Sequence, residues 1–133
     1  MKSYKNISYL LAITFALLFT ACTSFISPQP VTSMVPHGLT KEQVRIDIAD
    51  GCDIRNMTYK DISDNEIEAV HSRGNISISF SIKYDESQYT IMYKDSQNLA
   101  TDDGRVHSNY LRWVNNLKKS IDIELSKTKF HKK

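Results

Sequence analysis

An apolar stretch long enough to cross a membrane is missing from this sequence. The longest apolar run is Ile7–Phe19, whereas a membrane-spanning helix needs roughly 20 apolar residues. Two lysines precede this run, and the small residues Thr20 and Ala21 follow it. This order of charged, apolar and small residues is that of an export signal. We therefore expect residues 1–21 to direct secretion and then to be removed.

A net charge of one sign is also missing from the part of the chain that would remain. The formal net charge of +2 comes from two lysines within residues 1–21, and residues 22–133 hold 15 basic and 15 acidic side chains. Such a balanced chain lacks the positive field by which nucleic-acid-binding domains attract their ligand. We therefore expect no nucleic-acid partner. The charge is nevertheless uneven, since residues 112–133 carry seven Lys or Arg and two acidic residues.

The residues before the first of the two cysteines form a known motif. The stretch Leu18–Cys22, with the sequence LFTAC, resembles the lipobox of bacterial lipoproteins, in which a large apolar residue and two small ones precede an invariant cysteine. This resemblance implies cleavage after Ala21 and attachment of lipid to Cys22. Two or three acyl chains anchor a protein stably, since each buried methylene contributes about 0.8 kcal/mol. By the rules of the same family, Thr23 in place of aspartate implies an outer-membrane protein that faces the periplasm.

The scarcity of cysteine leaves one free thiol. Once Cys22 is lipidated, Cys52 is the last cysteine in the chain. Such a thiol is either buried as a small hydrophobic group or open to intermolecular pairing. A reactive cysteine needs a nearby base or positive charge, and Asp53 has the opposite effect. We therefore expect Cys52 to be buried.

Proline is equally scarce and is confined to one segment. All three prolines lie between residues 28 and 36, among serines and threonines. Because proline lacks a backbone donor and fixes φ, we expect residues 22–38 to be the lipidated cysteine and an extended tether. Residues 39–126 would then form a single α+β domain, since so short a chain supports one hydrophobic core. Residues 127–133 would be a basic tail.

A helix is predicted to begin after Thr40. Thr40 is a favourable N-cap residue, and Gln43 completes a capping box. Val44 and Ile48 then share one face of the helix. Gly51 is typical of a helix C-terminus, so we expect this helix to end there.

Four short segments with the character of strands follow. Residues 56–62 and 66–72 are separated by a polar turn. The strongest signal is in residues 76–84, where Ile, Phe and Tyr alternate with Ser and Lys, as in a strand with one buried face. Residues 89–93 alternate in the same way and would complete an antiparallel hairpin. Residues 94–106 are expected to be a long polar loop.

The last predicted element is an amphipathic helix. Apolar residues recur at spacings of three and four from Tyr110 to Leu125. The apolar face of the hairpin is the surface of matching size that this stripe can cover. We therefore expect an α+β fold in which two helices pack on one face of an antiparallel sheet of about three to four strands, in the order α-β-β-β-β-α.

A second resemblance concerns the last third of the chain. The residues that carry it are Tyr93-Lys94-Asp95-Ser96, Asp103-Gly104, His107, Asn109-Tyr110 and Trp113. This pattern resembles that of small uncharacterised lipoproteins of Gram-negative bacteria. The resemblance implies a shared architecture and location, and it implies no activity.

The same segment is our candidate binding loop. Its residues are Tyr93, Lys94, Asp95, Asn98, Asp103, His107, Tyr110 and Trp113. The carboxylates of Asp95, Asp102 and Asp103 and the imidazole of His107 could hold a divalent cation. Their spacing matches no standard calcium or zinc motif. A solvated turn capped by its own side chains is the more ordinary arrangement.

Ser96 lacks the Gly-x-Ser-x-Gly elbow of hydrolases. Tyr93, Tyr110 and Trp113 fit the buried stripes of their elements better than a recognition site. We therefore assign no catalytic residue, metal or cofactor.

These observations favour a non-enzymatic module of the bacterial envelope. We expect it to be held to the membrane through lipid on Cys22 and to bind a protein or another envelope component. The alternative is a small hydrolase or metal-binding protein that uses the loop from Asp95 to His107. Convergence of Asp95, Asp103 and His107 on one pocket would favour chemistry, and their dispersal would favour binding. The sequence leaves the oligomeric state open.

Overall fold

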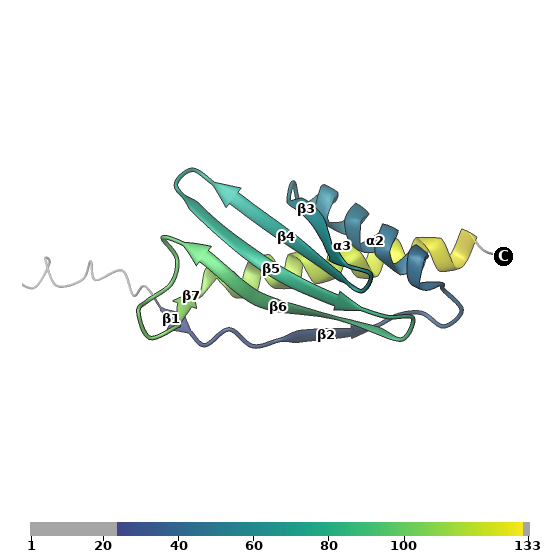
Figure 1. Ribbon diagram of the computed structural model, residues 1–133, viewed down its shortest axis with the longest axis horizontal. Helices are drawn as coiled ribbons and strands as arrows, with labels where there is room; N and C mark the ends of the chain where they lie inside the picture. Colours follow the sequence, from purple (N-terminus) through teal and green to yellow (C-terminus); the bar gives the residue numbers. More distant parts are fainter. Residues whose placement is uncertain (1–23, 132–133) are drawn as a thin grey trace, which may run out of the picture.

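The computed structural model describes residues 24–131. It contains a five-stranded antiparallel sheet with two helices on one face (Figure 1). The strands, in spatial order, are β2 (Val31–Met34), β6 (Gln88–Gln97), β5 (Ile76–Tyr84), β4 (Glu66–Arg73) and β3 (Thr58–Ser63). The helices are α2 (Lys41–Ile54) and α3 (Asn109–His131). A separate two-stranded sheet pairs β1 (Phe25–Ile26) with β7 (Val106–His107). The expected α+β class is confirmed, and strands lie between the two helices as expected. The short strand β7 between β6 and α3, and the strands β1 and β2 before α2, were not predicted.

The hairpin of β5 and β6 supplies the centre of the core. Ile78, Phe80 and Ile82 are buried on the helix side of β5, as the alternation predicted. The register places Ile82 opposite Ile91 and Tyr84 opposite Tyr89, so apolar side chains of both strands lie on one face. Burial of that face under α2 and α3 is the main source of stability.

Strand β6 is longer than expected. It continues to Gln97, so the first four residues of the expected loop 94–106 belong to the sheet. The ladder to β5 shifts register at Ser79 and Phe80 and then continues to Ser77, which lies opposite Gln97. Backbone pairing does not depend on side-chain polarity, so a polar segment can extend a strand.

The expected tether is part of the fold. Val31–Met34 forms the edge strand β2, in which Val31 lies opposite Ile91 of β6. This strand is the fifth of the sheet, whereas about three to four strands were predicted. Pro30 and Pro36 lie on either side of it, where a missing N–H interrupts no ladder bond. The prolines therefore delimit an edge strand rather than a free linker.

Helix α2 begins as predicted and ends later than predicted. The Gln43 N–H donates to Thr40 Oγ1 at 3.3 Å, and the Thr40 N–H donates to Gln43 Oε1 at 2.9 Å, so the capping box is present. Gly51 does not end the helix. The chain turns out of it at Asn56, whose φ is +53°, and the Met57 N–H donates to the Cys52 carbonyl. Gly51 instead lies where α2 crosses α3.

Helix α3 includes most of the expected basic tail. It runs to His131, so the described residues 127–131 are helical rather than frayed. Thr128 Oγ1 donates to Asp47 Oδ1 of α2 at 2.7 Å, and Lys129 Nζ donates to the His37 carbonyl. The domain therefore exceeds the expected boundaries 39–126 at both ends. No helix within residues 24–131 is long and apolar enough to cross a membrane.

Candidate functional site

Two tyrosines of the candidate loop pack together in the core. Tyr110 of α3 is buried, and its ring meets that of Tyr93 edge-on at 6.1 Å and stacks on Phe80 at 6.0 Å. The Tyr110 hydroxyl donates to the Gln29 carbonyl at 3.2 Å, and burial raises the pKa of Tyr110. The Tyr93 hydroxyl bonds with Ser96 Oγ at 2.8 Å. Each ring has its polar partner within the fold, so the pair acts as core.

Trp113 occupies a different place on α3. It is partly buried against the edge of the core, and its ring lies 5.3 Å from that of His71 on β4. His71 Nδ1 is buried and has no hydrogen-bond partner among the described residues. Burial, helped by the charge of Arg73, lowers the pKa of His71. The two rings therefore form an apolar contact that favours neutral imidazole.

The polar residues of the loop act locally. Asp95 Oδ1 accepts from the Ser96 N–H at 2.8 Å, and Asn98 Nδ2 donates to the Asn75 carbonyl at 2.6 Å. Asp103 Oδ2 pairs with Arg105 at 2.8 Å in an exposed turn. Hydrogen bonding by Thr101, then by Arg105, lowers the pKa of Asp103. Asp103 therefore caps its own turn, whereas Asp95 lies at the end of β6 and Asn98 bonds to the turn between β4 and β5.

His107 caps the N-terminus of α3. The Asn109 N–H donates to His107 Nδ1 at 3.1 Å, and the two rings of His107 and Phe25 meet edge-on at 6.0 Å. This nitrogen thus satisfies one of the free N–H groups at the N-terminus of α3. Asp95, Asp103 and His107 therefore each have separate partners. Within residues 24–131, no group of three or more His, Cys, Asp or Glu side chains is arranged to hold a metal ion.

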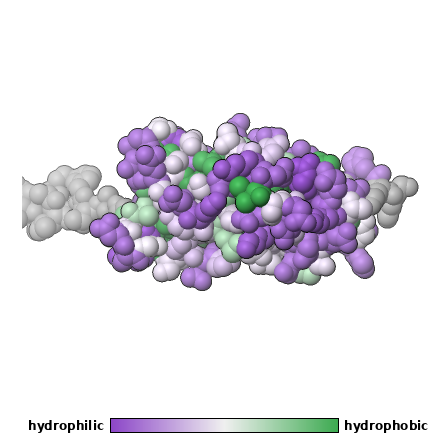
Figure 2. Space-filling model, viewed as in Figure 1, coloured by the Kyte–Doolittle hydropathy of each residue, from purple (hydrophilic) through white to green (hydrophobic). Residues whose placement is uncertain are grey.

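Lys94 lies on the sheet face opposite the helices, away from the tyrosines. It forms an ion pair with Glu68, whose second oxygen lies 3.4 Å from Lys60 Nζ. The hydrogen bond from Lys94 lowers the pKa of Glu68. Figure 2 shows this face as mostly hydrophilic, with small hydrophobic areas. A groove of about 340 Å³ lies here, lined by Thr58, Tyr59, Lys60, Glu68 and Val70.

Cys52 is the one cysteine among the described residues. Cys52 is completely buried, which confirms that prediction, and burial raises the pKa of its thiol to about 12. The negative charge of Asp53 adds to this shift. Such a thiol is inert as a nucleophile. Cys22 and the expected signal, residues 1–21, lie outside the described residues.

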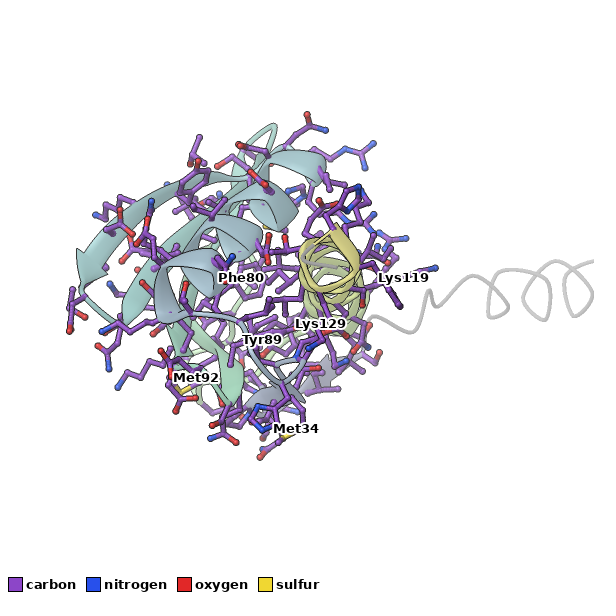
Figure 3. The ribbon with its side chains drawn as sticks, turned by 90° about the vertical axis from the view of Figure 1, so that its right-hand side faces the viewer. Met34, Phe80, Tyr89, Met92, Lys119 and Lys129 are labelled. Carbon is purple, nitrogen blue, oxygen red and sulfur yellow. The ribbon has the colours of Figure 1, made fainter. Side chains whose placement is uncertain are left out.

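A second groove lies on the side of α3 that faces away from the sheet. It has a volume of about 630 Å³ and is open to solvent. Its lining residues include Lys119, Ile123, Ser126 and Phe130. Figure 3 shows Lys119 pointing away from the sheet. The positive charge of this region was evident from the sequence. The exposed apolar residues Ile123 and Phe130 between the lysines were not predicted, although their helical spacing is a signal for them.

Comparison with known proteins adds no family assignment. No protein-family model matches this chain, and no curated protein matches it.

Proposed function

We propose that this chain is a lipid-anchored protein of the bacterial envelope whose folded domain is a non-enzymatic binding or structural module. The observation that carries the proposal is that Ser24, two residues after Cys22, is bonded to the domain. The lipobox pattern ends at Cys22, and Ser24 is already joined to the domain, because its carbonyl accepts from the Ser108 N–H at 3.0 Å. An export signal that is cleaved before Cys22 would thus leave the domain complete.

The geometry of the candidate loop supports a non-enzymatic role. Catalysis by Asp and His side chains requires them to reach one reacting group within hydrogen-bond distance. Here Asp103 bonds within its own exposed turn, and His107 accepts from the backbone of α3. Cys52, the one described thiol, is buried with a raised pKa. A partner protein or another envelope component therefore suits this domain better than a small substrate.

The proposed location follows from the same signal. Thr23 after the lipidated cysteine is the basis for placing the protein at the outer membrane, facing the periplasm. The anchor is lipid in this proposal, and two or three acyl chains give stable attachment.

Replacement of the lipidated residue tests the proposal. Cys22→Ser should abolish processing and membrane attachment, because serine has no thiol to receive the diacylglyceryl group. Mass spectrometry of the wild-type protein should show a modified Cys22 at its N-terminus. Cys52→Ala is the matched control, and it should be processed and attached normally. A mature protein with unmodified Cys22, or with Cys22 joined to Cys52, would disprove the proposal.

A further inference from the structure

We infer that the outer stripe of α3 lies on an anionic phospholipid surface and orients the domain along the membrane. This inference rests on the proposed lipidation of Cys22. The outer stripe consists of six exposed residues at spacings of three and four: Arg112, Asn115, Lys119, Ile123, Ser126 and Phe130. This spacing places them on one face of a helix, opposite the buried face that contacts the sheet and α2.

The connection between the proposed anchor and the domain is short. One residue, Thr23, separates Cys22 from Ser24. Consecutive Cα atoms are about 3.8 Å apart, so the Cα of Cys22 lies within roughly 8 Å of that of Ser24. Ser24 bonds to Ser108, which directly precedes α3. A lipid on Cys22 therefore holds the start of α3 at the membrane surface.

The outer stripe combines exposed apolar side chains with basic ones. Ile123 is 44% exposed and Phe130 is 71% exposed, which is costly in water and favourable at a lipid interface. Arg112 and Lys119 form no ion pair with the acidic residues of the described chain, whereas Lys118 and Lys127 beside the stripe pair with Asp122 and Glu124. A basic side chain near an anionic leaflet is attracted to it.

Helix α3 is long enough to make an extended contact. From Arg112 to Phe130 the stripe extends about 27 Å at 1.5 Å per residue. Its N-terminal end is next to the anchor, so the remaining length can settle on the surface without any change in the fold. Lys129 holds the C-terminal end of α3 to the body through the His37 carbonyl. The helix and the sheet would therefore approach the lipid surface as one rigid unit.

The opposite face of the domain suits a lipid surface poorly. Glu66 accepts a hydrogen bond from Ser81 on that face at 2.6 Å, and Glu68 takes part in ion pairs with Lys60 and Lys94. Figure 2 shows that this face is mostly hydrophilic. With the stripe on the membrane, this face points into the aqueous compartment, where it is free to meet a protein partner.

Spin labels on the lipidated protein test the orientation. Full-length protein is processed in cells, purified and placed in vesicles of phosphatidylcholine and phosphatidylglycerol at about 7:3. Single cysteines replace Ser126 on the stripe or, as the matched control, Ser87 in the turn between β5 and β6, which is also exposed. Cys52 is completely buried, and Cys22 carries lipid. A nitroxide reagent therefore labels the introduced cysteine alone.

We expect the label at Ser126→Cys to be accessible to oxygen and protected from a water-soluble nickel complex, and the label at Ser87→Cys to show the reverse. Lys119→Glu should remove most of the protection, and so should vesicles of phosphatidylcholine alone. Lys83→Glu, a charge reversal at an exposed position on the sheet face, should leave it unchanged.

Three results would contradict us, and they differ in meaning. A protein without lipid on Cys22 would overturn the proposed function together with the orientation that rests on it. Lipidated protein with water-exposed labels at both positions would overturn the orientation alone. Protection at Ser126 that is insensitive to lipid charge and rises with protein concentration would show that a second copy covers the stripe, which also overturns the orientation.

Discussion

The crossing of α2 and α3 depends on the absence of a side chain at Gly51. A Cβ added there would lie 2.6 Å from Ile121 Cγ1 and 3.0 Å from both the Cα and the backbone N of Ile121. A side chain could move aside, but two of these three atoms are backbone. Gly51→Ala therefore requires the two helices to separate locally.

Two opposing terms determine the size of the effect. Alanine in a helix interior is about 1 kcal/mol more favourable than glycine. Overpacking of a filled site costs about 1–3 kcal/mol, and the backbone contacts place this site at the upper end. We therefore expect Gly51→Ala to lower the free energy of unfolding by about 2 kcal/mol, out of a typical total of about 5–15 kcal/mol.

Urea denaturation of the chain without residues 1–21, carrying Cys22→Ser, would measure the loss. Asp50→Ala, at an exposed neighbouring position of α2, is the control for helix propensity and should not destabilise. Ile121→Ala should cost less in the Gly51→Ala background than alone, because it removes one of the clashing atoms. A Gly51→Ala protein that is more stable than wild type by about 1 kcal/mol would refute the close crossing.

Two further substitutions test the core and its one buried carboxylate. Because Trp113 is partly buried, Trp113→Ala should lower the free energy of unfolding by about 2–3 kcal/mol. This is less than the roughly 3–5 kcal/mol typical of a fully buried aromatic. A loss under about 1 kcal/mol in urea denaturation would contradict the contact with His71. Asp47 is 3% exposed, its Oδ2 has no partner among the described residues, and burial raises its pKa above 3.8. The folded state therefore favours the protonated acid, so this group makes stability rise as the pH falls through the raised pKa toward about 4. Asp47→Asn should remove that rise, because asparagine does not titrate in this range. An unchanged pH profile of stability in urea denaturation would refute this account.

Local signals predicted most of the fold. Thr40 and Gln43 identified the start of α2, because a capping box involves neighbouring residues. The alternation in Ile76–Tyr84 identified the buried strand, since one face of a half-buried strand must be apolar. The stripe from Tyr110 to Leu125 identified the helix that covers the sheet.

The errors share one cause, which is that the deciding contact is distant in sequence. Val31–Met34 resembled a linker and became a strand because β6, about 60 residues later, offers it an edge. Gly51 resembled a helix end, and its reason for being glycine is Ile121. Thr128 resembled part of a free tail, and it bonds to Asp47.

The candidate loop shows the same limit for function. Tyr93 and Tyr110 were correctly expected to fit the core, because each lies in the apolar stripe of its element. Sequence proximity suggested that Asp95, Asp103 and His107 could converge, but their directions depend on how β6 and the turn after it fold. The exposed stripe of α3 was recognisable in principle. Its relation to the proposed anchor was not, because that depends on the hydrogen bond between Ser24 and Ser108.

The sequence by itself determined the class of the fold, the order of its main elements and the lipobox pattern, because capping, periodicity and signal composition are properties of neighbouring residues. The tertiary structure alone decided that the proline-containing segment includes an edge strand, that α3 extends to His131, and that Ser24 is joined to Ser108 beside the start of α3. These features depend on backbone pairing and close packing between segments far apart in the chain, and no local pattern encodes which distant partner will satisfy a hydrogen bond or fill a contact.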